Sequence, residues 1–234
     1  MGRFWFLPIL AGLVAGCATG PGEATRPLQR SVPAAYGIDG FQQVEAIRYT
    51  FNVRLPDREV RRSWIWWPGE DRVTAAPADG GDPVTYRRSE LAGGAAPDLA
   101  EIDARFINDR YWLLFPFELA WDDTLRVEDR GEGTGPLTGR TLRHLVVYYP
   151  PTGGYTPGDV YELFADGDGR LAEWIYRKGG SPTPTRTTTW EAHRRAGPIL
   201  VATDHKGPGG DFRVWFTDVA VKVKGDDRWQ EAAP

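Results

Sequence analysis

The sequence predicts a mainly β protein of the α+β class, with a large curved antiparallel sheet and one or two helices. Apolar and polar residues alternate with period two in many short segments. The chain is 12% aromatic and has 28 glycines and 19 prolines among 234 residues, which is typical of short strands joined by turns. Helical periodicity is confined to one region, which excludes a fold of alternating strands and helices. A sheet of so many strands curls on itself.

The first 16 residues have the layout of a secretory signal. Arg3 precedes an apolar run, Phe4–Val14, which is shorter than the roughly 20 residues of a membrane-spanning helix. Small residues then lead to Cys17, which is the only cysteine in the chain. A single cysteine excludes an intrachain disulfide and a cysteine-rich zinc site. An ordinary export signal or an uncleaved anchor would look similar up to this point.

The residues Val14-Ala15-Gly16-Cys17 resemble the lipobox of bacterial lipoproteins. The resemblance implies that residues 1–16 are removed as a signal peptide and that Cys17 carries the acyl chains of a lipid anchor. Ala18 follows the cysteine, where an aspartate often retains bacterial lipoproteins at the inner membrane. This resemblance therefore implies a place in the cell envelope, on the periplasmic face of the outer membrane.

A change of composition near residue 40 divides the remaining chain. Residues 17–40 are rich in proline, glycine and alanine and have no periodicity, so we expect a lipidated cysteine followed by a flexible tether. No second linker and no repeat follows, which predicts one domain over 41–230. The formal net charge of −4, with interspersed signs, argues against nucleic acid as a partner.

The first half of the domain opens with strands. Val44–Leu55 alternates apolar and polar residues, which predicts a strand covered on one face. Val60–Trp67 follows at hairpin spacing, with Trp64 and Trp66 on one face. Shorter strands are expected at Arg72–Ala75 and Val84–Arg88.

A helix is expected to begin at Pro97, because Leu99, Ile102 and Phe106 form one apolar stripe at helical spacing. The next stretch, Tyr111–Trp121, is strongly aromatic. Its Pro116 lacks a backbone N–H, which argues against a regular central strand and against an uninterrupted helix.

The second half of the domain is predicted to consist of successive strands, because segments with β-branched or aromatic residues alternate with turn signals. The sequence Asp-Gly-Asp-Gly at 166–169 predicts a hairpin turn. The predicted strands are Thr141–Tyr149, Asp159–Ala165, Leu171–Lys178, Thr185–His193, Ile199–Thr203 and Phe212–Val223.

Motifs for catalysis and for cofactors are missing from the sequence. It has no G-x-S-x-G, no phosphate-binding glycine loop and no paired-histidine metal motif. The three histidines, His144, His193 and His205, lie on or beside predicted strands, while Glu118 lies within the aromatic stretch and Asp122 follows it. We predict no catalytic residue, no metal site and no cofactor, and these five side chains remain the candidates for an enzyme.

The aromatic residues are the strongest functional signal. Large rings on a curved sheet either fill its core or line an apolar cavity that can hold a ligand. Arg48 or Arg62 is the candidate to meet an anionic head group. The predicted ligand contacts come from one sheet face and from the aromatic stretch, and they are Phe51, Val53, Trp64, Trp66, Phe115, Phe117 and Trp121.

Several segments carry a resemblance to a known family. The strands predicted at Val44–Leu55 and Val60–Trp67, followed by a helix and an aromatic stretch with a proline, are similar to the opening of bacterial lipoprotein-localisation proteins. The hairpin Val160–Lys178 (VYELFADGDGRLAEWIYRK) and the ending Phe212–Val223 (FRVWFTDVAVKV) resemble the LolA/LolB-like group, which contains bacterial outer-membrane lipoprotein-sorting proteins. The resemblance implies an incomplete β-barrel with one or two plugging helices and with acyl chains held in its concave face. A lipobox on such a domain matches the membrane-anchored receptor of that group.

Together these observations predict a non-catalytic, lipid-anchored envelope protein that binds a lipid or another apolar ligand in the concave face of an open β-barrel. Its expected partners are the membrane, through the N-terminal lipid, the ligand itself, and other envelope proteins in lipoprotein or lipid transfer. Two alternatives stay open. One is an envelope glycan- or lipid-acting hydrolase that uses the carboxylates and histidines, and the other is a structural or assembly lipoprotein whose rings are all core.

Overall fold

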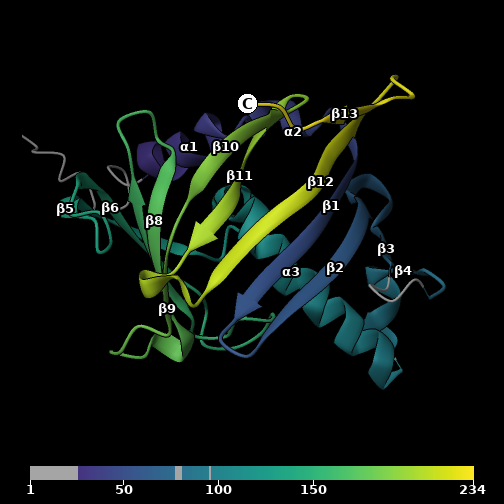
Figure 1. Ribbon diagram of the computed structural model, residues 1–234, viewed down its shortest axis with the longest axis horizontal. Coiled ribbons are helices and arrows are strands. Elements are labelled where there is room, and N and C mark those ends of the chain that lie inside the picture. Colours follow the sequence, from purple (N-terminus) through teal and green to yellow (C-terminus); the bar gives the residue numbers. More distant parts are fainter. Residues whose placement is uncertain (1–25, 77–80, 95) are drawn as a thin grey trace, which may run out of the picture.

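Two antiparallel sheets and a long helix make up the domain (Figure 1). The structure is a computed structural model, and it describes residues 26–76, 81–94 and 96–234. The predicted signal peptide, Cys17 and the first part of the tether lie outside these residues. The sheets are not closed into a barrel, so the predicted α+β class and open architecture are confirmed.

The larger sheet has eight strands in the order β10-β11-β12-β1-β2-β3-β4, with β13 paired to β12. All its pairs are antiparallel. The strands are β1 (Val44–Leu55), β2 (Arg58–Trp67), β3 (Arg72–Ala76), β4 (Val84–Arg87), β10 (Glu191–Ala196), β11 (Ile199–Lys206), β12 (Arg213–Val223) and β13 (Trp229–Glu231).

The smaller sheet has five strands in sequence order and is also antiparallel throughout. Its strands are β5 (Arg126–Thr134), β6 (Thr141–Tyr148), β7 (Val160–Ala165), β8 (Leu171–Arg177) and β9 (Arg186–Thr189). The α-helices of the described chain are α1 (Arg26–Ala35), α2 (Ile38–Phe41) and α3 (Pro97–Trp121), and short 3-10 turns lie at Pro68–Glu70, Arg88–Gly93, Lys178–Gly180 and Pro208–Gly210.

The predicted strands are present with ends within three residues of expectation, apart from Thr185–His193. That segment is two strands, β9 and β10, which belong to different sheets. Trp190 stands at the corner between them, 2% exposed, and its N–H donates to the Ala172 carbonyl oxygen at 2.7 Å. Ala192 has a φ of 51°, which turns the backbone into β10. The single predicted sheet is therefore two sheets that part at this corner.

Helix α3 covers the inner face of the larger sheet and crosses behind β12, β1 and β2 in Figure 1. The expectation of an interrupted helix at Pro116 was wrong, because α3 continues through that residue to Trp121. Proline in a helix interior costs about 3 kcal/mol. Residues 113–119 are all buried, so packing on every side of this part of the helix offsets that cost.

The segment 26–40, expected as part of the flexible tether, is folded. It contains α1 and α2, and Val32 and Tyr36 are 1% and 0% exposed. The Tyr36 hydroxyl hydrogen-bonds to Nε2 of His193 at 2.8 Å and accepts the Leu171 N–H at 3.2 Å. This part of the expected tether is therefore corrected to be part of the core. Residues 18–25 lie outside the described chain.

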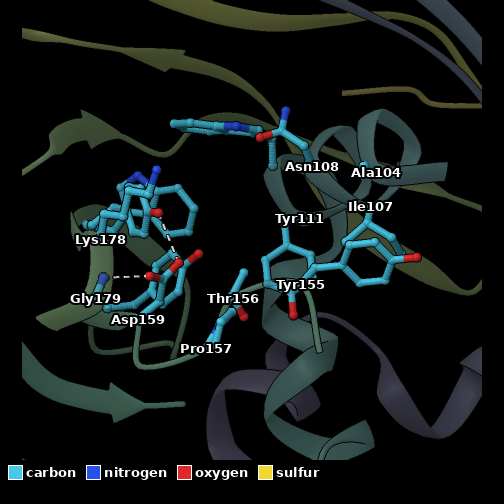
Figure 2. Close-up of a pocket in the computed structure, with 14 residues that line it drawn as sticks. Ala104, Ile107, Asn108, Tyr111, Tyr155, Thr156, Pro157, Asp159, Lys178 and Gly179 are labelled. Carbon is cyan, nitrogen blue, oxygen red and sulfur yellow. Dashed lines mark hydrogen bonds between the residues drawn. The ribbon is translucent and has the colours of Figure 1, made fainter. Parts of the chain in front are cut away.

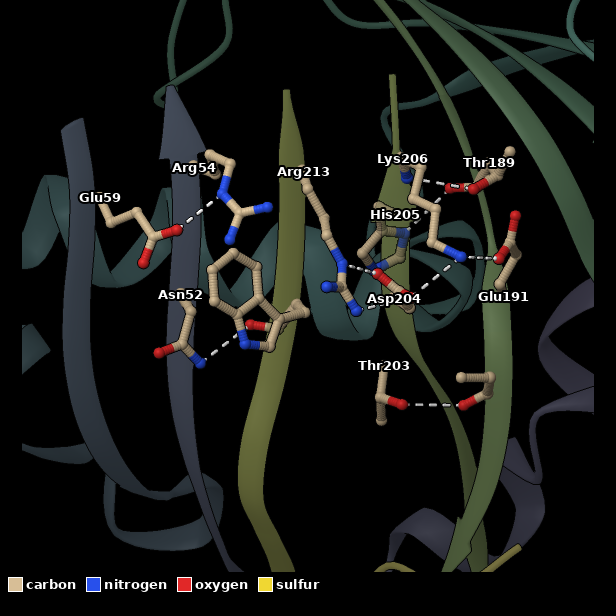
Figure 3. A network of polar contacts seen from close by, with 12 residues as sticks. Asn52, Arg54, Glu59, Thr189, Glu191, Thr203, Asp204, His205, Lys206 and Arg213 are labelled. Atoms are coloured by element: carbon tan, nitrogen blue, oxygen red, sulfur yellow. Dashed lines mark hydrogen bonds and ion pairs between the residues drawn. The ribbon is translucent and has the colours of Figure 1, made fainter. Parts of the chain in front are cut away.

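The outer face of the larger sheet is polar, as the alternation in Val44–Leu55 predicted. Figure 3 shows its hydrogen bonds and ion pairs, which run across neighbouring strands. Arg54 pairs with Glu59 at 2.6 Å, and Arg213 on β12 pairs with Asp204 on β11 at 2.7 Å. Asn52 on β1 donates to the Trp215 carbonyl oxygen on β12 at 3.2 Å. This face presents charge to solvent, while the opposite face holds the core.

Buried ion pairs fix α3 to the larger sheet. The Asp109 carboxylate, on a side chain with no exposure, accepts hydrogen bonds from Nε and Nη2 of Arg62 at 2.7 and 2.6 Å and from Nε1 of Trp64 at 2.9 Å. One turn and a half earlier, Asp103 accepts from the Tyr86 hydroxyl and from Nε of Arg88, each at 2.9 Å. These carboxylates set the position of the helix along the strands.

We expect Asp109→Ala to lower the free energy of unfolding by about 3–5 kcal/mol, because it leaves the half-buried Arg62 and the buried Trp64 N–H without their partner. Urea denaturation followed by circular dichroism measures this. Glu101→Ala on the exposed side of α3, paired only with Arg105 among the described residues, should change the value by less than about 0.5 kcal/mol. A loss below about 1 kcal/mol for Asp109→Ala would contradict the role given to this pair.

Candidate functional site

The residues predicted to line a ligand cavity are packed as core around α3. Trp66 and Trp121 have ring centroids 6.1 Å apart, and Trp121 stacks on Phe117 at 5.4 Å. Trp64 lies edge-on to Phe106 at 5.5 Å. Phe51 and Val53 are 2% and 8% exposed, and only Trp121 of the set is partly exposed. The concave face of the larger sheet is therefore filled by the side chains of α3.

Phe115 belongs to a different group of rings. It lies 4.8 Å from the Tyr161 ring and 5.3 Å from the Trp174 ring, on the side of α3 that faces the smaller sheet. Tyr111, one turn before Phe115, lies 5.9 Å from it. The structure thus divides the predicted lining residues between a core under the larger sheet and the back of a pocket beside the smaller one.

That pocket, called the aromatic pocket below, lies between α3, β7, β8 and the loop that precedes β7 (Figure 2). Its volume is about 430 Å³, within the range of small-molecule sites. Its lining is largely apolar and aromatic, with Asp159, Asn108 and Lys178 as its charged and amide groups. The six lining rings are Tyr111, Trp112, Tyr155, Tyr161, Trp174 and Tyr176.

Strand register brings three of these rings together. Tyr161 on β7 stands directly opposite Tyr176 on β8, and their rings stack at 5.0 Å. Trp174 lies two residues before Tyr176 and therefore on the same face of the sheet. It is 5.1 Å from Tyr161 and 4.9 Å from Trp112 on α3. The hairpin and the helix thus form one continuous aromatic wall.

A tight turn places the pocket's carboxylate. The Asp159 N–H donates to the Thr156 carbonyl oxygen at 3.1 Å, with Pro157 and Gly158 at the two central positions. Gly158 has a φ of 72°, which is the conformation that the second central residue of a type II turn requires. The Asp159 carboxylate is then held by the Gly179 N–H at 2.7 Å and by the Tyr176 hydroxyl at 2.9 Å.

Figure 2 shows how the labelled groups surround the pocket. Asp159, Gly179 and Lys178 lie on one side, while Tyr111 and Tyr155 lie on the other. Tyr155 is 51% exposed, and its hydroxyl donates to Asp103. Burial first, and next the hydrogen bond to Asp159, raise the pKa of Tyr176, so this hydroxyl keeps its proton and remains a donor.

The candidate enzyme residues do not converge. Glu118 is ion-paired with Arg110 at 2.7 Å, and Asp122 accepts hydrogen bonds from Thr124 just after the end of α3. Burial raises the pKa of Glu118. Each histidine has its own surroundings: His144 bonds to Glu162 at 3.0 Å, His193 to Tyr36, and His205 to the Thr189 carbonyl oxygen at 3.2 Å. Among the residues that the structure describes, none of these histidines lines the aromatic pocket.

The arginines suggested for an anionic head group are already paired. Arg62 binds Asp109, and Arg48 binds Glu231 across β1 and β13. In the described part of the chain, no group of three or more His, Cys, Asp or Glu side chains is placed to hold a metal ion. No helix of residues 26–76, 81–94 and 96–234 is long and apolar enough to cross a membrane.

The sequence reasoning missed most of the aromatic pocket. A signal for it was present: counting outward from the 166–169 turn pairs Tyr161 with Tyr176 and puts Trp174 on their face. Trp112 and Tyr111 could not be assigned to the pocket from the sequence, because that assignment depends on the helix continuing past Tyr111 and packing on this hairpin.

The fold defines an α+β protein in which two open antiparallel sheets pack on one buried helix. Solved structures similar to this chain include a DUF1329 family protein from Desulfovibrio piger, with a TM-score of 0.50 and 12% identity over 89% of this chain and 96% of that one. This likeness shows a shared fold. No family model matches the sequence, and no curated protein matches it.

Two further similar structures carry names from the predicted group. One is an outer membrane lipoprotein-sorting protein domain from Vibrio parahaemolyticus, with a TM-score of 0.46 and 13% identity over 86% of this chain and 93% of that chain. The other is a LolA superfamily protein from Nitrosomonas europaea, with a TM-score of 0.48 and 10% identity over 83% and 92%. The open α+β architecture that the resemblance implied is observed.

His205 gives the wall of the pocket a pH dependence. It is fully buried between Trp112 and Trp190, and burial lowers its pKa from 6.5 to about 3. The unfolded chain takes up this proton near pH 6.5 and the folded chain does not, so stability falls as the pH falls from there toward 3. We expect His205→Gln to remove a slope of up to about 1.4 kcal/mol per pH unit between pH 6 and pH 4.

Urea denaturation at pH 7, 5 and 4 measures this slope for the wild type and the variant. The pKa of His193 is also lowered by burial, so part of the slope should remain in His205→Gln. His144→Gln on the smaller sheet is the matched control. An unchanged slope in His205→Gln would show that the buried imidazole does not set the acid sensitivity.

Proposed function

We propose that this chain is a lipid-anchored envelope protein that binds an apolar ligand, such as a lipid acyl chain, in the aromatic pocket without chemical conversion. The observation that carries the proposal is the pocket itself, with about 430 Å³ of space between six aromatic rings. Apolar burial of this kind contributes about 25 cal/mol per Å² before the cost of ordering the ligand.

The residues predicted from the sequence enter this proposal in two ways. Phe115 supports the rings of Tyr161 and Trp174 from behind, so it belongs to the proposed site. Phe51, Val53, Trp64, Trp66, Phe117 and Trp121 stay predicted ligand contacts. Phe51, Val53, Trp66 and Phe117 are buried, whereas Trp64 also lines a separate hollow of about 610 Å³ between β2, β3 and α3. Transfer of lipids or lipoproteins between partners also remains a proposal.

Filling the pocket should abolish ligand binding. Ala104 is an exposed residue of α3 that lines the aromatic pocket, and Ala100 is exposed one turn earlier on the same helix without lining it. We expect Ala104→Trp to weaken binding of monolauroylglycerol, a neutral amphiphile, at least tenfold, while Ala100→Trp leaves it unchanged. Isothermal titration calorimetry and the fluorescence of the lining tryptophans measure the binding.

This proposal would be contradicted if the wild-type chain took up no such amphiphile and carried no bound ligand in native mass spectrometry after purification. That result would favour the structural or assembly alternative, in which all rings are core. Equal losses in both alanine variants would show that the substitutions act on the helix and not on the pocket.

The lipid anchor is tested separately. We propose that Cys17 carries it, on the strength of its lipobox-like surroundings. Cys17→Ala should therefore abolish incorporation of radiolabelled palmitate and move the protein from the membrane fraction to the soluble periplasmic fraction. Continued labelling of the variant would contradict the assignment.

A further inference from the structure

The pocket's carboxylate has no basic partner. Asp159 is only 4% exposed, and the donors that hold it, the Gly179 N–H and the Tyr176 hydroxyl, are both neutral. No ion pair joins it to a basic side chain within the part of the chain that the structure describes. Burying a carboxylate without a counter-charge is costly, so the missing charge calls for an explanation.

Most other buried carboxylates of the described chain do have that partner. Four of them lie within 2.9 Å of an arginine nitrogen, and these pairs are Asp103–Arg88, Asp109–Arg62, Glu118–Arg110 and Asp204–Arg213. An arginine partner is therefore the usual way in which this protein buries an acidic side chain.

Glu173 also lacks an arginine, but its surroundings differ from those of Asp159. The 135–140 loop closes over it, with the Leu137 N–H at 2.7 Å and the Thr138 N–H at 3.2 Å. A Cβ added at Gly135 would come within 2.6 Å of the Glu173 carboxylate, so no ligand could approach from that side. Asp159, by contrast, lines an open pocket.

The walls beside Asp159 are suited to a cation. Faces of tryptophan and tyrosine attract ammonium groups within about 6 Å of the ring centroid, and the attraction is stronger at desolvated sites. Tyr161, Trp174 and Tyr176 stand on the strands next to Asp159, and Trp112 and Tyr111 face them from α3. A carboxylate among ring faces matches a positively charged, weakly hydrated organic group.

We propose that the aromatic pocket binds an organic ammonium group, with Asp159 as its counter-ion and the surrounding rings as its walls. The inference rests on the proposed function and narrows it, because it makes the ligand a cationic or zwitterionic amphiphile. The ammonium group supplies the charge that Asp159 lacks, and the attached chain occupies the apolar remainder of the pocket.

Lys178 affects which ammonium head group the pocket should prefer. It is the single basic side chain in the pocket lining, it is exposed, and it forms no ion pair with Asp159. At the mouth it repels a simple cation and attracts the phosphate of a zwitterionic head group. Lys178→Gln should therefore tighten the binding of a simple ammonium amphiphile by a few fold and weaken that of a phosphocholine amphiphile.

The test compares head groups on one 12-carbon chain, using the full chain with Cys17→Ser and titration calorimetry below the micelle-forming concentrations. Dodecyltrimethylammonium should bind at least tenfold more tightly than dodecyl sulfate. Asp159→Asn should reduce the affinity for the cation at least tenfold and leave that for monolauroylglycerol within about twofold. Asp168→Asn, an equal charge change on the exposed 166–169 turn, should have no effect.

Each outcome separates the two proposals. If the cation, the anion and the neutral amphiphile bind alike, the apolar pocket stands and the ammonium inference is overturned. If choline binds but no 12-carbon amphiphile does, the cation site stands and the apolar ligand fails. If nothing binds, both fail. If circular dichroism shows that Asp159→Asn is unfolded, two other measurements test the ammonium inference. These are the head-group preference of the parent chain and the changes in affinity in Lys178→Gln.

Discussion

The buried helix α3 is the constraint on which the rest of the structure depends. Residues 113–119 are buried without a break, so the helix needs cover on every side over two turns. One sheet cannot provide that cover, because a sheet packs against one side of a helix. The larger sheet covers the side of α3 that carries Phe106 and Trp121, which pack on Trp66 of β2, and the smaller sheet covers the side that carries Phe115. The division of the strands into two sheets follows from this requirement.

The same helix carries acidic groups into the core, and these fix its position more sharply than apolar contacts could. Asp109 and Asp103 meet arginines from the first strands of the larger sheet and from the turn after β4. Apolar packing tolerates small shifts along the helix axis, whereas bidentate pairing between a carboxylate and a guanidinium does not. The position of Tyr111 and Trp112 beside the smaller sheet is therefore set partly by ion pairs on the opposite side of α3.

Strand content, the hairpin at 166–169 and the start of the helix could be predicted from local patterns, because period-two alternation and turn residues act over a few positions. Three features of the fold could not be predicted from local patterns. β5 is rich in charge and glycine, so it has no apolar alternation to detect. The segment 185–196 has no glycine or proline to mark the corner at Trp190, so Thr185–His193 was predicted as one strand. The helix through Pro116 is stabilised by burial, which is a tertiary effect that no local pattern reports.

The residues of the predicted site are packed as core for a related reason. Trp64, Trp66 and their neighbours do share a face, as the alternation indicated, yet that face is covered by α3. A pattern of rings shows which face is apolar, and it does not show what fills the space above it. The aromatic pocket arose where the covering is incomplete, between α3 and the β7–β8 hairpin.

The location of the pocket has a consequence for ligand entry. The loop at its mouth, residues 151–155, is exposed, and of its side chains Tyr155 reaches a buried group, Asp103. Four lining residues, Ile107, Tyr111, Tyr155 and Thr156, also line a neighbouring hollow of about 500 Å³, so this loop borders two spaces. Displacing it breaks the contacts of Tyr155 with Asp103 and Arg88 and leaves the ion pair between those two residues in place. Entry at this mouth therefore requires much less rearrangement than entry under the larger sheet, where α3 would have to leave its ion pairs with Arg62 and Arg88.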